Sequence, residues 1–247
     1  MAKAKQASQA IAPLRSDRHA DYTVSPVTDF TFASGMNFIP LVLGELARAS
    51  REFPIVFARG ENGLLPGIVS GLKTGQNLLV DGDGNWIGKY IPALLRRYPF
   101  IMSENGKNTN DRKLTLCIDT NYDGFEEHGD GERLFETDGS ASSFAQEQIN
   151  FLVTLDRQAL QTQRFCAALE ETGIIEAKKV SFSIDEKSST SELAGIFLIN
   201  REKLHSLEAD TLTEWTGLGY LELAHAHLAS LQNFEELGRR AAEVELV

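Results

Sequence analysis

NLLVDGDGNWIGKYI, residues 77–91, is a clear strand–turn–strand pattern. Two short apolar runs, 77–80 and 86–91, flank the acidic-glycine segment 81–84. Aspartate and glycine are typical of the tight turns that join neighbouring antiparallel strands, because they tolerate the backbone angles that such turns need. The stretch therefore predicts a β-hairpin.

Further short apolar runs, bounded by Gly, Asn, Asp and Pro, predict more strands. These runs are 55–57, 68–69, 114–118, 180–184 and 196–199. In 114–118, three apolar residues alternate onto one face and leave Cys117 on the other. No helical segment of the kind that connects parallel strands lies between 64 and 118, which favours an antiparallel sheet.

Apolar residues at helical spacing predict three main helices. They span 40–52, 142–171 and a segment that begins near 219. Pro40 suits the first turn of the first helix. Ser142 or Ser143 can cap the second helix, and Gly173 ends it.

Together these elements predict an α+β fold. We expect a central, largely antiparallel sheet with a long helix after residue 142 and a C-terminal helix packed on it. Residues 1–25 are polar and rich in Ala, Gln and Ser, which predicts a mobile tail. Residues 26–247 are then expected to form a single domain.

Composition excludes several classes of function. The net charge of −11 would repel a phosphate backbone, so we expect no nucleic-acid binding. No run approaches the roughly 20 apolar residues that a membrane-spanning helix needs. The two cysteines are far apart in the sequence, which is typical of thiols in a reducing compartment. The N-terminus also carries no apolar signal-peptide core, so we expect a cytoplasmic location. Export without a leader stays an open alternative.

Signatures of catalysis are missing from the sequence. We find no GxSxG elbow, no P-loop and no GxGxxG after a predicted strand. His225 and His227 lie two residues apart on a predicted helix, so they cannot share a metal ion. We interpret His225 as a histidine at the edge of the core.

The segment DTNYDGFEEHGD, residues 119–130, resembles a calcium-binding loop. Four oxygen-bearing residues occupy positions 1, 3, 5 and 12 of that loop: Asp119, Asn121, Asp123 and Asp130. Three features depart from the pattern, namely the short Asp at position 12, Glu126 at position 8 and a strand in place of the incoming helix. We therefore favour a solvated turn, with calcium as the alternative, and expect no other cofactor.

The segment WIGKYIPALLRRYPF, residues 86–100, concentrates aromatic and basic residues in an acidic chain. These types are enriched where proteins bind their partners. The candidate residues for binding a protein, peptide or small-molecule ligand are Trp86, Tyr90, Arg96, Arg97 and Tyr98. The alternative is that the aromatic rings fill the core while the arginines pair with surface carboxylates.

Several blocks of the sequence resemble the bacterial SapC family. These blocks are FPIVFA (53–58), VDGDGNWIGKYIPALLRRYPF (80–100), LCID (116–119), LFETDG (134–139) and GYLELAHAHLASLQNFEEL (219–237). The family takes its name from a surface-layer locus, and similar proteins are encoded near tryptophan halogenases and TonB-dependent receptors. The resemblance implies no catalytic residues.

Three functions follow from these observations, in order of preference. The first is a non-catalytic accessory or binding protein that uses the 86–100 segment. The second is an enzyme that acts on a peptide or an aromatic metabolite through a site without a sequence motif. The third is a calcium-stabilised component associated with a surface layer.

Overall fold

The computed structural model describes residues 10–61, 63–105, 113–182 and 191–245. They form two compact units, each assembled from segments that are distant in sequence. Unit 1 comprises Met1–Thr28 and Arg97–Asp156, and unit 2 comprises Asp29–Arg96 and Arg157–Val247. The expectation of a single domain over 26–247 stays a prediction.

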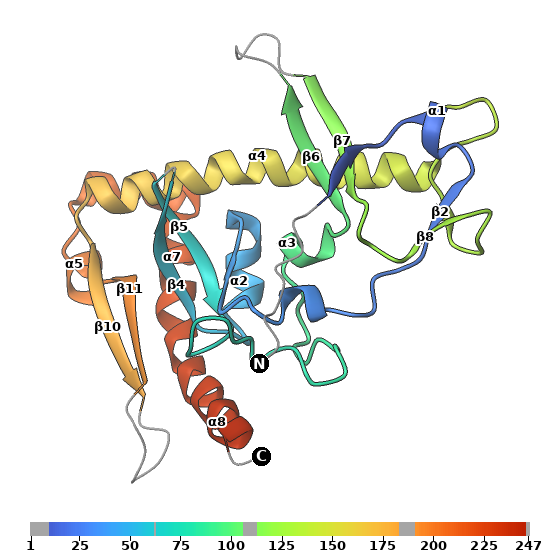
Figure 1. Cartoon of the computed structure of the whole chain (residues 1–247). Coiled ribbons are helices and arrows are strands. Elements are labelled where there is room, and N and C mark those ends of the chain that lie inside the picture. The colour runs from blue at the N-terminus through green and yellow to red at the C-terminus, as the bar shows by residue number, and fades with distance from the viewer. Residues whose placement is uncertain (1–9, 62, 106–112, 183–190, 246–247) are drawn as a thin grey trace. The chain divides into compact units, whose positions relative to one another are not determined.

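Unit 2 contains a five-stranded antiparallel sheet in the order β10-β11-β4-β5-β3 (Figure 1). Its strands are β3 (Phe38–Pro40), β4 (Ile55–Gly60), β5 (Gly63–Val69), β10 (Ile175–Phe182) and β11 (Ser191–Ile199). β4 and β5 form a hairpin whose pairs run from Ile55↔Ile68 to Gly60↔Gly63. This pairing confirms the strands predicted at 55–57 and 68–69.

The helices of unit 2 pack against this sheet and around it. They are η1 (Thr31–Ala33), η2 (Leu43–Glu45), α2 (Leu46–Ala49), α3 (Ala93–Arg96), α5 (Arg201–His205), α6 (Ala209–Leu218), α7 (Tyr220–Ser230), η4 (Leu231–Asn233) and α8 (Phe234–Glu245). α7 runs beside β4 and β11 (Figure 1). α8 inserts Leu237 and Ala241 against Val56, Val69 and Ile196 of the sheet. His227 of α7 contacts Phe57, the next residue of β4 after Val56, whose side chain points to the opposite face.

Unit 1 contains two three-stranded antiparallel sheets, ordered β1-β7-β6 and β8-β2-β9. Its elements are β1 (Ile11–Pro13), α1 (Ser16–His19), β2 (Tyr22–Val24), β6 (Phe100–Asn105), β7 (Lys113–Asp119), β8 (Phe125–Glu127) and β9 (Glu132–Arg133). The core of this unit joins Val24, Phe100, Ile118, Leu134 and Leu152. Val24, Phe100 and Ile118 come from strands of the two sheets, Leu134 follows β9, and Leu152 belongs to the long helix.

α4 (Ser143–Glu171) is the long helix that the sequence predicts, and it contributes residues to both units. Ser142 caps it, because its Oγ accepts the N–H of Ala145 at 3.1 Å. Gly173 follows its C-terminal end with φ of +64°, a conformation that glycine adopts without steric cost. With the antiparallel sheets and the C-terminal helix, these features confirm the α+β fold.

The helix predicted over 40–52 is much shorter than expected. Pro40 closes the edge strand β3, where it pairs with Gly67 and where a missing N–H is tolerated. Helical backbone is limited to η2 and α2, residues 43–49. Pairing with the sheet thus overrides the local preference of this segment for helix.

Residues 11–24 lie in the segment that the sequence assigns to a mobile tail, yet they form β1, α1 and β2. β1 pairs with β7, and β2 pairs with β8 and β9. Val24 is 3% exposed, so one apolar side chain of this polar segment is a core residue. Short paired strands such as these have too few residues to give a clear period in the sequence.

The hairpin predicted over 77–91 is reduced to a single bridge, Val80↔Trp86. The turn itself forms, because Asp81 Oδ1 accepts the N–H groups of Asp83 at 3.0 Å and Asn85 at 2.8 Å. Residues 87–91 do not continue as a strand. Two glutamates, Glu45 and Glu52, bind this segment instead, and they also position the candidate site.

Candidate functional site around Tyr90

The side chain of Glu45, at the end of η2, is buried with 6% exposure. Its Oε1 accepts hydrogen bonds from the Tyr90 hydroxyl at 2.6 Å and from the Ala93 N–H at 2.7 Å. Its Oε2 accepts the N–H of Val42 at 3.0 Å, the position of a helix-capping glutamate. Because a buried carboxylate is costly unless it is hydrogen-bonded, these bonds fix η2 and the 90–93 segment to each other.

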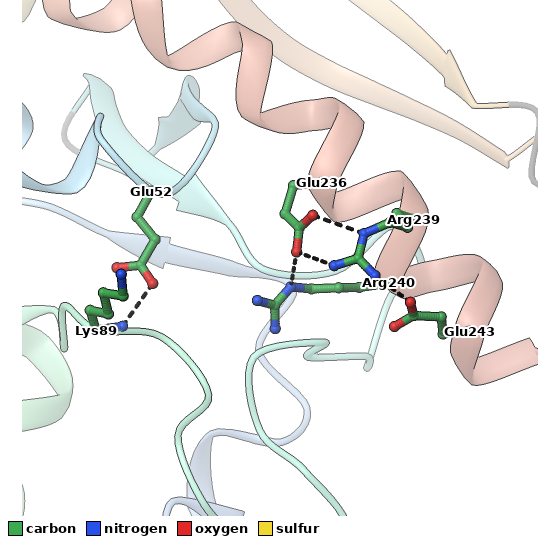
Figure 2. Close-up of polar contacts among 6 residues, drawn as sticks. All are labelled: Glu52, Lys89, Glu236, Arg239, Arg240 and Glu243. Carbon is green, nitrogen blue, oxygen red and sulfur yellow. Dashed lines mark hydrogen bonds and ion pairs between the residues drawn. The ribbon is translucent and has the colours of Figure 1, made fainter.

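Glu52 fixes the same segment from its other side. Its Oε1 accepts the backbone N–H of Lys89 at 2.7 Å (Figure 2). Its Oε2 accepts the backbone N–H of Tyr90 at 3.0 Å. The Trp86 indole N–H donates to the Tyr90 carbonyl at 2.9 Å. In a hairpin, backbone N–H groups of the second strand donate to carbonyls of the first strand. Here the N–H groups of Lys89 and Tyr90 donate to the Glu52 carboxylate instead, which explains why the predicted strand 86–91 does not form.

Trp86 is half-buried between two phenylalanine rings. Its ring centroid lies 6.1 Å from those of both Phe30 and Phe53. A Cβ on Gly88 would stand 2.7 Å from Phe53 and from the Trp86 indole nitrogen, so only glycine fits there. The neighbouring Ile87 side chain remains 45% exposed.

Two arginines contact the Tyr90 ring. The ζ carbons of Arg48, from α2, and Arg96, from α3, each lie 5.9 Å from the ring centroid, within the range of cation–π contacts. Arg96 also donates from Nε to the Ile91 carbonyl at 2.9 Å, and its Nη2 lies 4.0 Å from Glu45 Oε1. Its side chain is still 45% exposed, and Arg48 is exposed.

Tyr90 is held in its neutral form. Burial and the hydrogen bond to Glu45 raise the pKa of Tyr90 to about 12, although Arg96 acts in the opposite direction. The hydroxyl therefore stays a donor to Glu45 at physiological pH. The aromatic ring, which is electron-rich on its face, attracts the guanidinium groups of Arg48 and Arg96.

Arg97 and Tyr98, the remaining two predicted binding residues, belong to unit 1. Burial lowers the pKa of Arg97. The Tyr98 ring packs edge-on against Tyr122 with centroids 5.4 Å apart, and burial with the charges of Asp119 and Asp123 raises the pKa of Tyr98 to about 12. The structure thus groups Trp86 and Tyr90 with Arg96, and a role for Arg97 and Tyr98 stays a prediction.

The predicted calcium loop follows β7. Asp119 is buried, and its Oδ1 accepts the N–H of Asn121 at 3.0 Å, while Asp123 and Asp130 are exposed. Strand β8 occupies residues between Asp123 and Asp130, where a calcium-binding loop would supply further ligands to the ion. Across the described ranges, no three or more His, Cys, Asp or Glu side chains are grouped for metal binding. Calcium binding stays a prediction.

Sequence reasoning did not find Glu45, Arg48 or Glu52. One signal was present, since Glu45 lies in the apolar run LVLGELA. A glutamate there must either disrupt the core or serve as a buried acceptor. The partner residues, at 89–96, could not be deduced from spacing.

The fold is α+β, and the residues around Tyr90 bring tyrosine, tryptophan and arginine together, which are types enriched at protein interfaces. The family model described as SapC matches residues 14–237, so the chain belongs to the SapC family. No curated protein and no solved structure matches the chain significantly. Among the described residues, no helix has both the length and the apolar character to cross a membrane.

Proposed function

We propose that this SapC-family chain is a non-catalytic accessory protein that binds a partner protein. The binding surface consists of Trp86, Ile87, Tyr90, Arg48 and Arg96, and we call it the Tyr90 surface. The observation that supports this proposal is the pair of exposed arginines, Arg48 and Arg96, each with its ζ carbon 5.9 Å from the centroid of the Tyr90 ring. All five residues belong to unit 2.

Rigidity of the backbone supports a role in binding. Within residues 89–93, the carboxylates of Glu45 and Glu52 accept hydrogen bonds from three backbone N–H groups and from the Tyr90 hydroxyl. A segment that is already ordered loses less conformational entropy when a partner binds. Tyrosine, tryptophan and arginine are also the residue types that contribute most to binding energy in protein interfaces.

Site-specific photocrosslinking tests the proposal directly. A benzophenone amino acid replaces Ile87, which is 45% exposed, and the control replaces Leu218 on α6, which is 53% exposed. In lysate from cells that naturally produce the protein, we expect a discrete crosslinked species from position 87 alone. Trp86→Ala should weaken this crosslink at least about tenfold, because removing an interface anchor costs about 2 kcal/mol.

Two results would contradict a binding role. One is a crosslink pattern at 87 that matches the pattern at 218. The other is full retention of the specific species by Trp86→Ala, provided that far-ultraviolet circular dichroism shows the variant to be folded.

A further inference from the structure

We infer that the Tyr90 surface recognises carboxylates, and that its partner presents an acidic segment. This inference rests on the proposed function and specifies the chemistry of the partner. It is carried by the local charge, by the way the local glutamates are used, and by the exposure of the two arginines.

The charge around Tyr90 is opposite to that of the whole chain. Three cationic residues lie next to Tyr90 or to the glutamates that hold its segment: Arg48, Lys89 and Arg96. Only two carboxylates, Glu45 and Glu52, accompany them in these contacts. A chain with net charge −11 thus carries a locally positive surface here.

The local glutamates are occupied by backbone groups. Both oxygens of Glu52 accept backbone N–H groups, and Glu45 accepts two backbone N–H groups and the Tyr90 hydroxyl. The nearest approach of Glu45 to the Arg96 guanidinium is 4.0 Å, beyond hydrogen-bonding distance. The oxygens of both glutamates therefore serve mainly backbone groups and the Tyr90 hydroxyl, and Glu45 adds a long ion pair with Arg96.

α8 shows the opposite arrangement within the same unit. Arg239 is hydrogen-bonded to both Glu236 and Glu243, and Arg240 bonds Glu236 at 3.0 Å (Figure 2). For Arg48, the contact that the structure gives within the described residues is the face of Tyr90. The guanidinium groups of α8 are thus already paired with carboxylates, whereas the donors of Arg48 remain directed to solvent or to a partner.

The two arginines lie close enough together for one short segment to reach both. Each ζ carbon lies 5.9 Å from the same ring centroid, so the two cannot be farther apart than twice that distance. Acidic residues three or four apart on a helix, or two apart on an extended strand, fall within such a span. The exposed Ile87 adds an apolar contact beside them.

An acidic peptide fits better than a nucleic acid. Nucleic-acid binding needs many phosphates to be neutralised along a continuous basic track. The positive surface here is confined to a few residues of an acidic chain, which would repel the flanking phosphates. A short acidic segment contacts the cations alone.

The test is an NMR titration of the ¹⁵N-labelled full-length protein with hexaglutamate at about 20 mM salt. We expect chemical-shift changes at the Trp86 indole and at the Lys89, Tyr90 and Ala93 amides. Affinity should fall at least about tenfold in the Arg48→Gln/Arg96→Gln variant and should also fall steeply at about 300 mM salt. Arg201→Gln is the matched control, because Arg201 is exposed on α5 in the same unit.

A second variant separates guanidinium recognition from simple charge. Arg48→Lys/Arg96→Lys keeps both charges but removes the planar fork, so we expect an affinity between those of the wild type and the double glutamine variant. Unchanged chemical shifts outside the Tyr90 surface would verify that each variant is folded.

Several outcomes would overturn the inference. They are an absence of shifts with hexaglutamate, equal binding by the wild type and the double glutamine variant, and stronger binding of hexalysine or of oligothymidylate. The photocrosslink at Ile87 distinguishes the two proposals. If Trp86→Ala abolishes that crosslink while Arg48→Gln/Arg96→Gln retains it, the partner binds here without carboxylate recognition, and the proposed function still stands.

Discussion

At the scale of single residues, one glutamate determines the geometry of the candidate site. Glu45 joins η2 to the 90–93 segment through bonds to Tyr90, Ala93 and Val42. Its burial would be unfavourable without these donors. The residue is therefore structural, and it sets the position of the Tyr90 ring.

Glu45→Gln should destabilise unit 2 by about 2–4 kcal/mol. The amide replaces one carboxylate oxygen by a donor, so either the Val42 N–H or the pair of bonds to Tyr90 and Ala93 loses its acceptor. Urea unfolding followed by tryptophan fluorescence measures this loss. Both tryptophans of the chain, Trp86 and Trp215, belong to unit 2.

Glu222→Gln is the matched control for this measurement. Glu222 lies exposed on α7, so its replacement should change the free energy of unfolding by less than about 0.5 kcal/mol. If Glu45→Gln were as mild as Glu222→Gln, Glu45 would not be the structural centre of the site.

At the scale of elements, the start of α4 depends on one side chain with two roles. Ser142 Oγ accepts the Ala145 N–H at 3.1 Å and donates to the Arg133 carbonyl at 2.5 Å. The serine thus caps the helix and ties its first turn to β9.

Ser142→Ala should cost the N-terminal turn of α4 about 1 kcal/mol, the usual value of a helix cap. Amide hydrogen exchange detects this as exchange about fivefold faster at Ala145 and its neighbours. Ser143→Ala is the control, because Ser143 is exposed and should leave the exchange rates unchanged. Equal rates in the two variants would show that the cap contributes nothing measurable.

Elements with strong local signals are the ones that the sequence predicts correctly. α4 has a serine cap, a buried stripe that includes Leu152 and Leu169, and Gly173 after its end, and it forms as predicted. The hairpin predicted at 77–91 does not form beyond one bridge, because Glu52 accepts the N–H groups of Lys89 and Tyr90 in its second half. This contact joins distant segments, so the local sequence pattern does not predict it. The sequence finds Trp86, Tyr90 and Arg96 by composition, but their carboxylate supports come from another segment.

At the scale of the whole molecule, the negative charge and the core of unit 2 determine how the protein responds to its surroundings. The chain carries a net charge of −11, so the salt concentration should affect any contact between its charged surface and a partner. The core also contains a titratable group. His227 is 0% exposed, whereas His225, which we expected at the core edge, is exposed. The helical phase of α7 places His227 inward, towards Phe57.

Acid should selectively destabilise unit 2 through His227. Its Nε2 accepts the Ile199 N–H at 3.1 Å, Nδ1 has no hydrogen-bond partner among the described residues, and burial lowers the pKa of His227 from 6.5 to about 4. Between these values the unfolded chain binds a proton that the native state does not bind. Stability is therefore complete above pH 6.5 and is lost as the pH falls towards 4, by on the order of 3 kcal/mol in total.

His227→Gln removes the titration while offering an amide oxygen to the Ile199 N–H. Urea unfolding at several pH values, followed by tryptophan fluorescence, should show a shallower loss of stability between pH 6.5 and 4 than in the wild type. His225→Gln, two residues away and exposed, should retain the wild-type slope. Parallel pH profiles for the wild type and His227→Gln would mean that His227 does not govern the acid response, and that carboxylates elsewhere in the chain do.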